Sequence, residues 1–224
     1  MPPSAGYQPA RRISSCPTTS LVVFWMLAAA AWGAGEPRVV YTKVFPGSAP
    51  AYVSITVDQS GAVSYKESAE EEEPEKFDLE PAATAAIFEL AGKLDHFNRK
   101  LESGLKVANL GQKTFRWEDA GAASEAKFNY SQDDNARQLQ DWFERITETE
   151  RSMLELKHAL RYDKLGVYEA LLKIETIWNA KRLAGAAQML PLLDRVAQND
   201  TYLHMARERA ANLAAAIRAQ KGKG

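Results

Sequence analysis

A single seam of mostly apolar residues runs through the second half of the chain and restricts its fold more than any other feature. Its members recur at alternating intervals of three and four residues: Leu139, Trp142, Ile146, Thr149, Met153, Leu156 and Leu160. This heptad spacing predicts one long helix, of about seven turns, that starts near Asp133. Ser131 and Asp134 have the spacing of a capping box at its start. A helix with one apolar seam needs other elements to cover that seam.

Three shorter helices are expected after the long one, over residues 167–181, 187–198 and 201–219. Pro191 falls in the first turn of the second, where it is tolerated, and Asn199 or Asp200 can cap the third. Their apolar stripes consist of Leu171, Ile174, Trp178, Leu190, Leu193, Val196, Met205, Leu213 and Ile217. Because these stripes need one another for burial, we expect an antiparallel helical bundle over residues 131–220.

The first half of the chain has a shorter period. Five segments rich in β-branched and aromatic residues alternate between apolar and polar side chains and predict strands, namely 38–45, 51–58, 62–66, 113–119 and 124–130. Gly61, which can adopt positive φ, closes the turn before the third strand. One helix is expected over residues 79–97, with Pro81 in its first turn. The sequence therefore predicts an α+β fold, in which a small antiparallel β-rich part with one helix, residues 34–130, precedes the bundle.

The first 33 residues have the order of an export signal. Arg11 and Arg12 precede an uncharged apolar run at residues 21–32, and small residues lead to an expected cut ahead of Ala34. The run is short for a bilayer crossing, which takes about 20 apolar residues. Its removal takes away Cys16, the only cysteine, and leaves a mildly acidic chain with no disulfide and no thiolate ligand. That charge does not favour nucleic acid, which calls for a basic patch.

A run of glutamates separates the third predicted strand from the helix that follows. It contains Glu67, Glu70, Glu71, Glu72, Glu73 and Glu75. A calcium-binding loop interleaves its ligands with turns around a central glycine, and this run has no such device. The turn at Asp58 also departs from the D-x-D-x-D-G start of such a loop. Like charges in series repel, so residues 67–76 are expected to form a solvated acidic spacer.

One pattern resembles half of a metal site. Glu155 and His158 form a Glu-x-x-His pair, which supplies ligands in carboxylate-bridged di-iron bundles. Such a site needs two of these motifs, and here both side chains fall at c and f positions, on the water side of the seam. His96 and His204 lie on other predicted elements. No catalytic, cofactor-binding or metal-binding residue is therefore predicted, and no cofactor.

The remaining candidates favour structural roles. Phe115, Trp117, Phe128 and Tyr130 alternate along the last two strands, where core packing is expected rather than a platform for a sugar or a base. Basic residues near the C-terminus suit the end of a helix dipole: Arg207, Arg209, Arg218, Lys221 and Lys223. The sequence has no G-x-S-x-G elbow, no phosphate-binding glycine-rich loop and no H-E-x-x-H motif.

The order of elements, together with three segments, resembles a family of exported bacterial proteins of the acidobacterial type. The segments are "LESGLKVANLGQKTFRWED" from Leu101, "DKLGVYEALLKIE" from Asp163 and "LPLLDRV" from Leu190. The resemblance implies export and the outline of the fold. It implies no activity and no catalytic residue.

The function expected from the sequence is that of a noncatalytic protein, secreted or periplasmic, that serves as an interaction or scaffold module. Its partner is an unknown protein of the cell envelope, and no membrane contact is expected after signal cleavage. Thr149 in the seam and open strand edges are features that can receive a partner helix or strand. Two alternatives are an exported enzyme whose site forms only in three dimensions, and a structural protein anchored by an uncleaved N-terminal helix.

Overall fold

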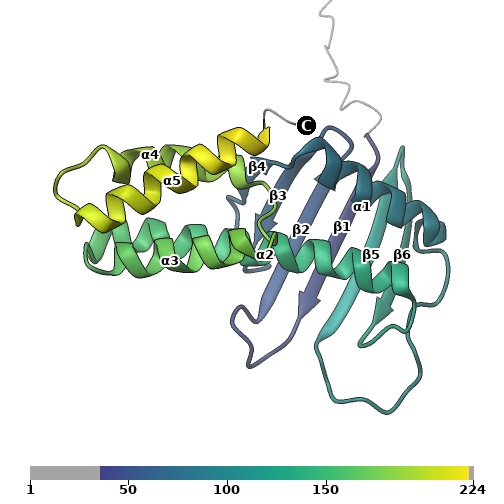
Figure 1. Cartoon of the computed structure of the whole chain (residues 1–224). Coiled ribbons are helices and arrows are strands. Elements are labelled where there is room, and N and C mark those ends of the chain that lie inside the picture. The colour runs from purple at the N-terminus through teal and green to yellow at the C-terminus, as the bar shows by residue number, and fades with distance from the viewer. Residues whose placement is uncertain (1–35, 222–224) are drawn as a thin grey trace, which may run out of the picture. The chain divides into compact units, whose positions relative to one another are not determined.

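Six strands form one antiparallel sheet in the first part of the chain (Figure 1). The computed structural model describes residues 36–221, so the predicted signal peptide and Cys16 lie outside the described residues. The strand order is β4-β3-β2-β1-β5-β6. The strands are β1 (Arg38–Val44), β2 (Tyr52–Asp58), β3 (Ala62–Lys66), β4 (Glu75–Asp78), β5 (Gln112–Asp119) and β6 (Ala122–Phe128). All but β4 agree with the sequence-based prediction.

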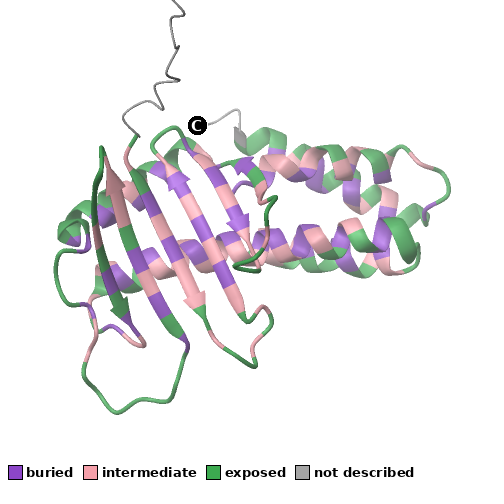
Figure 2. Ribbon diagram, turned by 180° about the vertical axis from the view of Figure 1, so that it is seen from behind, coloured by how far each residue is buried: buried purple, intermediate pink, exposed green. Residues whose placement is uncertain are grey.

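The alternation of side chains explains why these segments pair as strands. Val39 and Tyr41 of β1 are buried on one face of the sheet, while Val40 and Thr42, which alternate with them, are partly exposed on the other. Figure 2 shows the same alternation along the neighbouring strands. The turn between β2 and β3 requires Gly61, because its φ is +92° and a Cβ there would lie 2.9 Å from Thr84 Oγ1.

Two helices cover the buried face of the sheet (Figure 1). They are α1 (Pro81–Lys93), followed by the short 3₁₀ turn η1 (Asp95–Phe97), and α2 (Asp134–Tyr162). The apolar core between helices and sheet includes Ile55, Ile87, Leu90, Phe115, Leu139, Phe143 and Ile146.

The long helix α2 begins where predicted, with a different cap. Asp133 is the N-cap residue, and its carboxylate accepts the backbone N–H groups of Asn135 and Ala136. Ser131 accepts the N–H of Asp133 instead. The predicted capping box of Ser131 and Asp134 is therefore wrong, because a carboxylate at the N-cap already satisfies both amides.

The second half of α2 leaves the sheet and joins a bundle with α3 (Gly166–Asn179), α4 (Leu190–Ala197) and α5 (His204–Lys221), with the 3₁₀ turn η2 (Ala186–Met189) before α4 (Figure 1). This bundle has its own core, which includes Met153, Leu156, Val167, Leu171, Ile174, Met189, Leu193, Val196, Leu213 and Ile217. The predicted α+β fold with a bundle around one long helix is confirmed. The boundary predicted between residues 130 and 131 lies just before a helix that contributes to both cores. Among residues 36–221, no helix has the length and apolar composition needed to cross a membrane.

Two positions of the predicted apolar stripes differ in the structure. Trp142 is only partly buried, whereas its neighbour Phe143 is fully buried in the sheet core. Met205 is exposed, whereas its neighbour Ala206 is buried in the bundle core. The other members of the predicted stripes are buried or partly buried.

Candidate functional site

A cavity of about 640 Å³ lies beside β4, at the junction of the sheet and the bundle. One wall is the chain from Lys76 to Ala82, and the others are η2, Trp178 of α3 and the end of α5 at Ile217 and Gln220. Phe77, Trp178 and Ile217 make these walls largely apolar. The volume falls within the range of about 300–1,000 Å³ that ligand pockets occupy. We refer to this cavity as the β4 cleft.

Strand β4 presents an edge to the cleft. Among the described residues, β4 pairs only with β3, and the N–H of Leu79 donates to the carbonyl of Gly61 at 2.9 Å. In an antiparallel pair every second residue bonds to the neighbouring strand. Phe77 therefore bonds toward β3, and the N–H and C=O groups of Lys76 point away from it, whereas the outward carbonyl oxygen of Asp78 lies 3.3 Å from where a Cβ on Gly185 would be. The cleft thus combines apolar walls with outward-pointing backbone groups.

The segment before η2 is held against the connection between β4 and α1. Both oxygens of the Glu80 carboxylate accept a backbone N–H, from Gly185 at 2.9 Å and from Ala186 at 3.1 Å. Gly185 has a φ of +70°, and a Cβ added there would lie 2.9 Å from the ring of Phe77. This close approach of backbone to ring requires glycine. It fixes one wall of the cleft.

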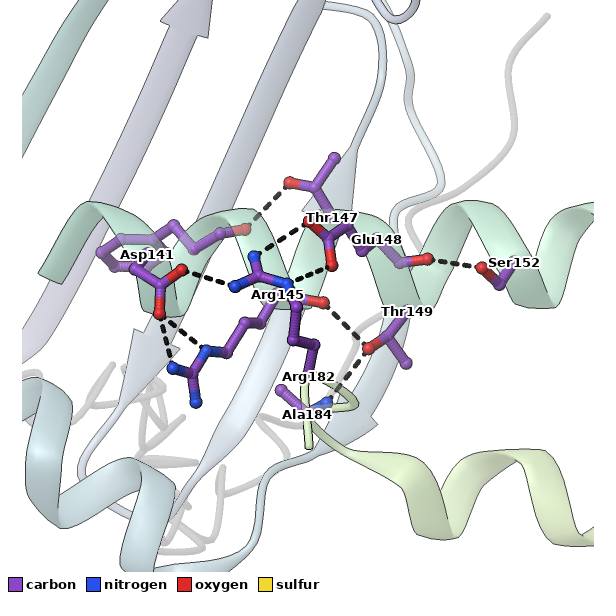
Figure 3. A network of polar contacts seen from close by, with 9 residues as sticks. Asp141, Arg145, Thr147, Glu148, Thr149, Ser152, Arg182 and Ala184 are labelled. Carbon is purple, nitrogen blue, oxygen red and sulfur yellow. Dashed lines mark hydrogen bonds and ion pairs between the residues drawn. The ribbon is translucent and has the colours of Figure 1, made fainter. Parts of the chain in front are cut away.

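Polar side chains on α2 anchor the same segment from the other side (Figure 3). The guanidinium of Arg182 binds the Glu148 carboxylate through two bonds of 2.8 and 2.9 Å, and Asp141 through a third of 2.8 Å. Arg145 also binds Asp141, at 2.7 Å. Burial alone would raise the pKa of Asp141, but the hydrogen bonds from Arg182 and Arg145 outweigh it and lower that pKa.

Thr149 occupies a seam position and bonds to its own chain. Its hydroxyl donates to the carbonyl of Arg145 at 2.8 Å and accepts the N–H of Ala184 at 3.0 Å (Figure 3). The expectation that this polar seam position receives a partner helix is therefore wrong, because the segment that precedes η2 already fills the place.

Glu150 is buried behind the cleft wall. Its side chain is fully buried, and one carboxylate oxygen accepts a hydrogen bond from the amide of Gln188, which lines the cleft. The other oxygen has no hydrogen-bond partner within residues 36–221. Burial raises the pKa of Glu150 to about 7; the Gln188 bond and Lys157 oppose this, while the carboxylates of Glu75 and Glu67 add to it. Glu150 itself does not line the cleft, whereas its hydrogen-bond partner Gln188 does.

The acidic run is only partly the solvated spacer that the sequence predicts. Three of its members are exposed, namely Glu70, Glu72 and Glu73. Glu71, however, accepts the backbone N–H of Glu67 at 2.9 Å, and Glu75 belongs to β4 and pairs with Lys157 at 3.0 Å. The prediction fails at this end because burial of Phe77 draws the chain into the sheet.

The three histidines lie on separate elements and are exposed. The ring of His96 lies 4.4 Å from that of Trp117, His158 lies beside Tyr162, and His204 begins α5. Glu155 and His158 face water as predicted. Within the part of the chain that the structure describes, no group of three or more His, Cys, Asp or Glu side chains is arranged to hold a metal ion.

The aromatic residues of β5, of β6 and of the segment after it have the expected packing role. Phe115 and Phe128 are buried with their ring centroids 5.1 Å apart, and Trp117 and Tyr130 are partly buried.

Three basic residues of the last helix each pair with an acidic side chain of the bundle region, namely Arg207, Arg209 and Arg218.

No family model, no curated protein and no solved structure matches this chain. The polar lining consists of Lys76, Asp78, Glu80, Gln188 and Gln220, and both oxygens of Glu80 are engaged in holding the wall. The arrangement can enclose an apolar side chain and exchange hydrogen bonds with the backbone of the segment that carries it.

Proposed function

We propose that the protein is an exported, noncatalytic interaction module that binds an extended segment of a partner protein in the β4 cleft. The observation that carries this proposal is the meeting of the outward-pointing backbone of Lys76 with a cavity walled by Phe77 and Trp178. An extended segment can pair with such a strand edge and place one side chain in the cavity. The backbone bonds would supply affinity, and the enclosed side chain would supply specificity.

Hydrogen bonds hold one wall of the cleft in place, which favours binding. Glu80, Thr149 and Arg182 hold one wall in place through hydrogen bonds to backbone or to α2. A preformed site loses little conformational entropy when its ligand arrives. The charges nearby favour a basic segment, because Glu72 and Glu73 are exposed just ahead of β4 and Asp78 is exposed at its end.

The enzyme alternative has less support in the cleft. Glu150 is the acid there with a strongly raised pKa, and Gln188 separates it from the cavity. A general acid must come within hydrogen-bond reach of its substrate.

The binding proposal is tested with peptides selected from a displayed random library against the wild-type protein. Lys76→Pro removes the outward N–H but keeps the ladder to β3, so selected peptides are expected to lose binding. Lys76→Ala removes only the side chain and is the matched control. Ala187→Trp fills the cleft and is also expected to abolish binding, whereas Ala85→Trp on the exposed side of α1 is not. Peptides that bind all four variants equally would contradict the proposal.

Export is tested separately by the intact mass of the protein isolated from its host. A chain that begins near Ala34 is expected. A mass that still includes Cys16 would contradict cleavage.

A further inference from the structure

The loop that leads into β5 carries exposed apolar side chains. Leu105, Val107 and Leu110 are 51%, 39% and 44% exposed, and Val44, which pairs with Gln112 at the end of this loop, is 42% exposed. In Figures 1 and 2 the loop projects past the ends of the strands at the lower side of the sheet. Burying these side chains would remove apolar surface from water, so the loop is a candidate contact surface.

The backbone of this loop is fixed from behind. The buried ammonium group of Lys113 donates to the carbonyls of Leu110, Gly111 and Asn129 at 3.1, 3.2 and 2.8 Å. The side chain of Asn129 accepts the N–H of Leu110 at 2.7 Å and donates to the carbonyl of Ala108 at 2.9 Å. The apolar side chains are therefore presented by an ordered frame, which lowers the entropy lost on binding.

The loop is cationic although the whole chain is not. Of residues 98–111, which we call the β5 loop, three are basic, with Arg99 paired to Asp133, and one is acidic. That acid, Glu102, turns inward and accepts the N–H of Asn129 at 2.6 Å. Lys100 and Lys106 are exposed and have no ion pair within residues 36–221. The glutamate run follows β3 and therefore lies at the same end of the sheet as the start of β5, with β2 and β1 between it and this loop.

A second group of exposed apolar residues provides a comparison. It lies at the turns that precede α3 and α5 and consists of Tyr162, Leu165, Leu203 and Met205. Charges of both signs surround it: Asp200 pairs with Arg207, and Asp163 accepts the N–H of Gly166. The apolar side chains of this group are more exposed than those of the β5 loop. Because positive and negative side chains both lie beside them, this group does not favour a partner surface of either charge.

We infer that the β5 loop binds the surface of an anionic membrane, with Leu105, Val107 and Leu110 in the headgroup boundary and Lys100 and Lys106 at the lipid phosphates. Apolar side chains beside cations are typical of segments that bind at this interface. Four half-exposed aliphatic side chains offer a few hundred Å², whereas a stable protein complex buries about 800 Å² per partner. A lipid surface needs no such area, because each inserted side chain and each lysine contributes separately.

This contact is peripheral and differs from the sequence-based expectation of a mature chain without membrane contact. The contact also leaves the β4 cleft open, so the two proposals do not depend on each other.

The test is cosedimentation of the full chain, as its host processes it, with vesicles of phosphatidylcholine alone or mixed equally with phosphatidylglycerol. Binding is expected only to the mixed vesicles. The double variant Leu105→Asn, Leu110→Asn and the double variant Lys100→Gln, Lys106→Gln are each expected to bind about tenfold more weakly. Leu165→Asn with Leu203→Asn is the matched control and is expected to bind as the wild type does. Circular dichroism establishes that each variant is folded.

Three results would overturn the inference. Equal binding to both kinds of vesicle would show that the contact does not depend on the lysines of the β5 loop. An equal loss in the control variant would move the contact to the bundle turns. No binding to either vesicle would instead favour an acidic protein surface as the partner of the loop. Lys76→Pro is expected to leave vesicle binding unchanged, so failure of the cleft proposal is distinguishable from failure of this one.

Discussion

Arg182 and Glu148 form a two-pronged ion pair, in which Nε lies 2.8 Å from Oε2 and Nη2 lies 2.9 Å from Oε1 (Figure 3). The pair joins the segment before η2 to the middle of α2, and the two side chains are 31% and 41% exposed. Water and salt screen a pair of this exposure, so its stabilisation is modest. The two parallel bonds fix the orientation of the guanidinium relative to the carboxylate, and the pair therefore serves mainly to position the cleft wall.

Arg182→Lys tests this positioning role. Lysine keeps the charge but cannot reach both oxygens of Glu148 and Asp141 as a fork, so the free energy of unfolding in urea is expected to fall by about 1 kcal/mol. Amide exchange at Ala184 should also become faster, because the segment before η2 that forms the cleft wall is held less firmly. Arg145→Lys is the control with a smaller expected effect, because Asp141 is the one carboxylate that Arg145 binds within residues 36–221. Equal effects of the two variants would show that the fork has no special role.

Glu150 is expected to make stability depend on pH. Its pKa is raised from 4.5 to about 7 in the folded protein, so both states are protonated below about pH 4.5 and the group then has no effect. As pH rises, the unfolded state releases its proton first and stability falls, until the folded state also ionises near pH 7. The loss amounts to about 3 kcal/mol at about 1.4 kcal/mol per pH unit.

Glu150→Gln removes this dependence. The variant is expected to exceed the wild type in unfolding free energy by about 2 kcal/mol at mildly alkaline pH, because a neutral amide is buried in place of a charge. Near pH 4.5 the difference should nearly vanish. Urea denaturation at both pH values measures it, with the exposed Glu72→Gln as the control. An unchanged pH dependence in Glu150→Gln would assign the effect to other groups.

Phe143 is expected to matter more than Trp142, contrary to the heptad seam. Phe143 is fully buried and stacks on Tyr41 with ring centroids 4.8 Å apart, whereas Trp142 is partly buried under Arg145. Phe143→Ala should destabilise the protein by about 3–5 kcal/mol and Trp142→Ala by about 1–2 kcal/mol. Thermal melts and urea denaturation measure both, and Phe143→Leu provides a milder variant. A larger loss of unfolding free energy for Trp142→Ala than for Phe143→Ala would favour the heptad seam that the sequence predicts.

The seam shows what periodicity can and cannot predict. It correctly gave one long helix, but a single seam assumes one covering surface. In the structure the first half of α2 buries Leu139, Phe143 and Ile146 against the sheet, and the second half turns another side toward the bundle. Glu150 follows Phe143 and Ile146 at steps of three and four residues. That spacing is the one signal in the sequence that indicates its burial.

The cleft had no comparable signal. Strand β4 buries one aromatic side chain, Phe77, and follows a glutamate run, so its strand character depends on pairing with β3 rather than on local pattern. The other walls come from Trp178, from η2 and from the end of α5, which are far apart in the chain. Gly185 is necessary for the wall only because Phe77 lies against it. Tertiary contact of this kind cannot be inferred from one segment.

Gly185 and Gly104 allow a matched test of how firmly the cleft wall is held. Their φ angles are +70° and +71°, so alanine is strained by about 1 kcal/mol at either position. At Gly104 the added methyl group meets no atom within 4 Å, whereas at Gly185 it would lie 2.9 Å from the Phe77 ring. Gly104→Ala is therefore expected to lose about 1 kcal/mol in urea denaturation.

Gly185→Ala is expected to lose about 2 kcal/mol more than that, because the segment must move away from Phe77 and release the bonds between Glu80 and the backbone. Faster amide exchange at Ala186 and weaker binding of the selected peptides should accompany the loss. Equal losses at the two glycines would mean that Phe77 moves aside at little cost. The wall would then be compliant rather than preformed, and the cleft would have to be shaped by its ligand.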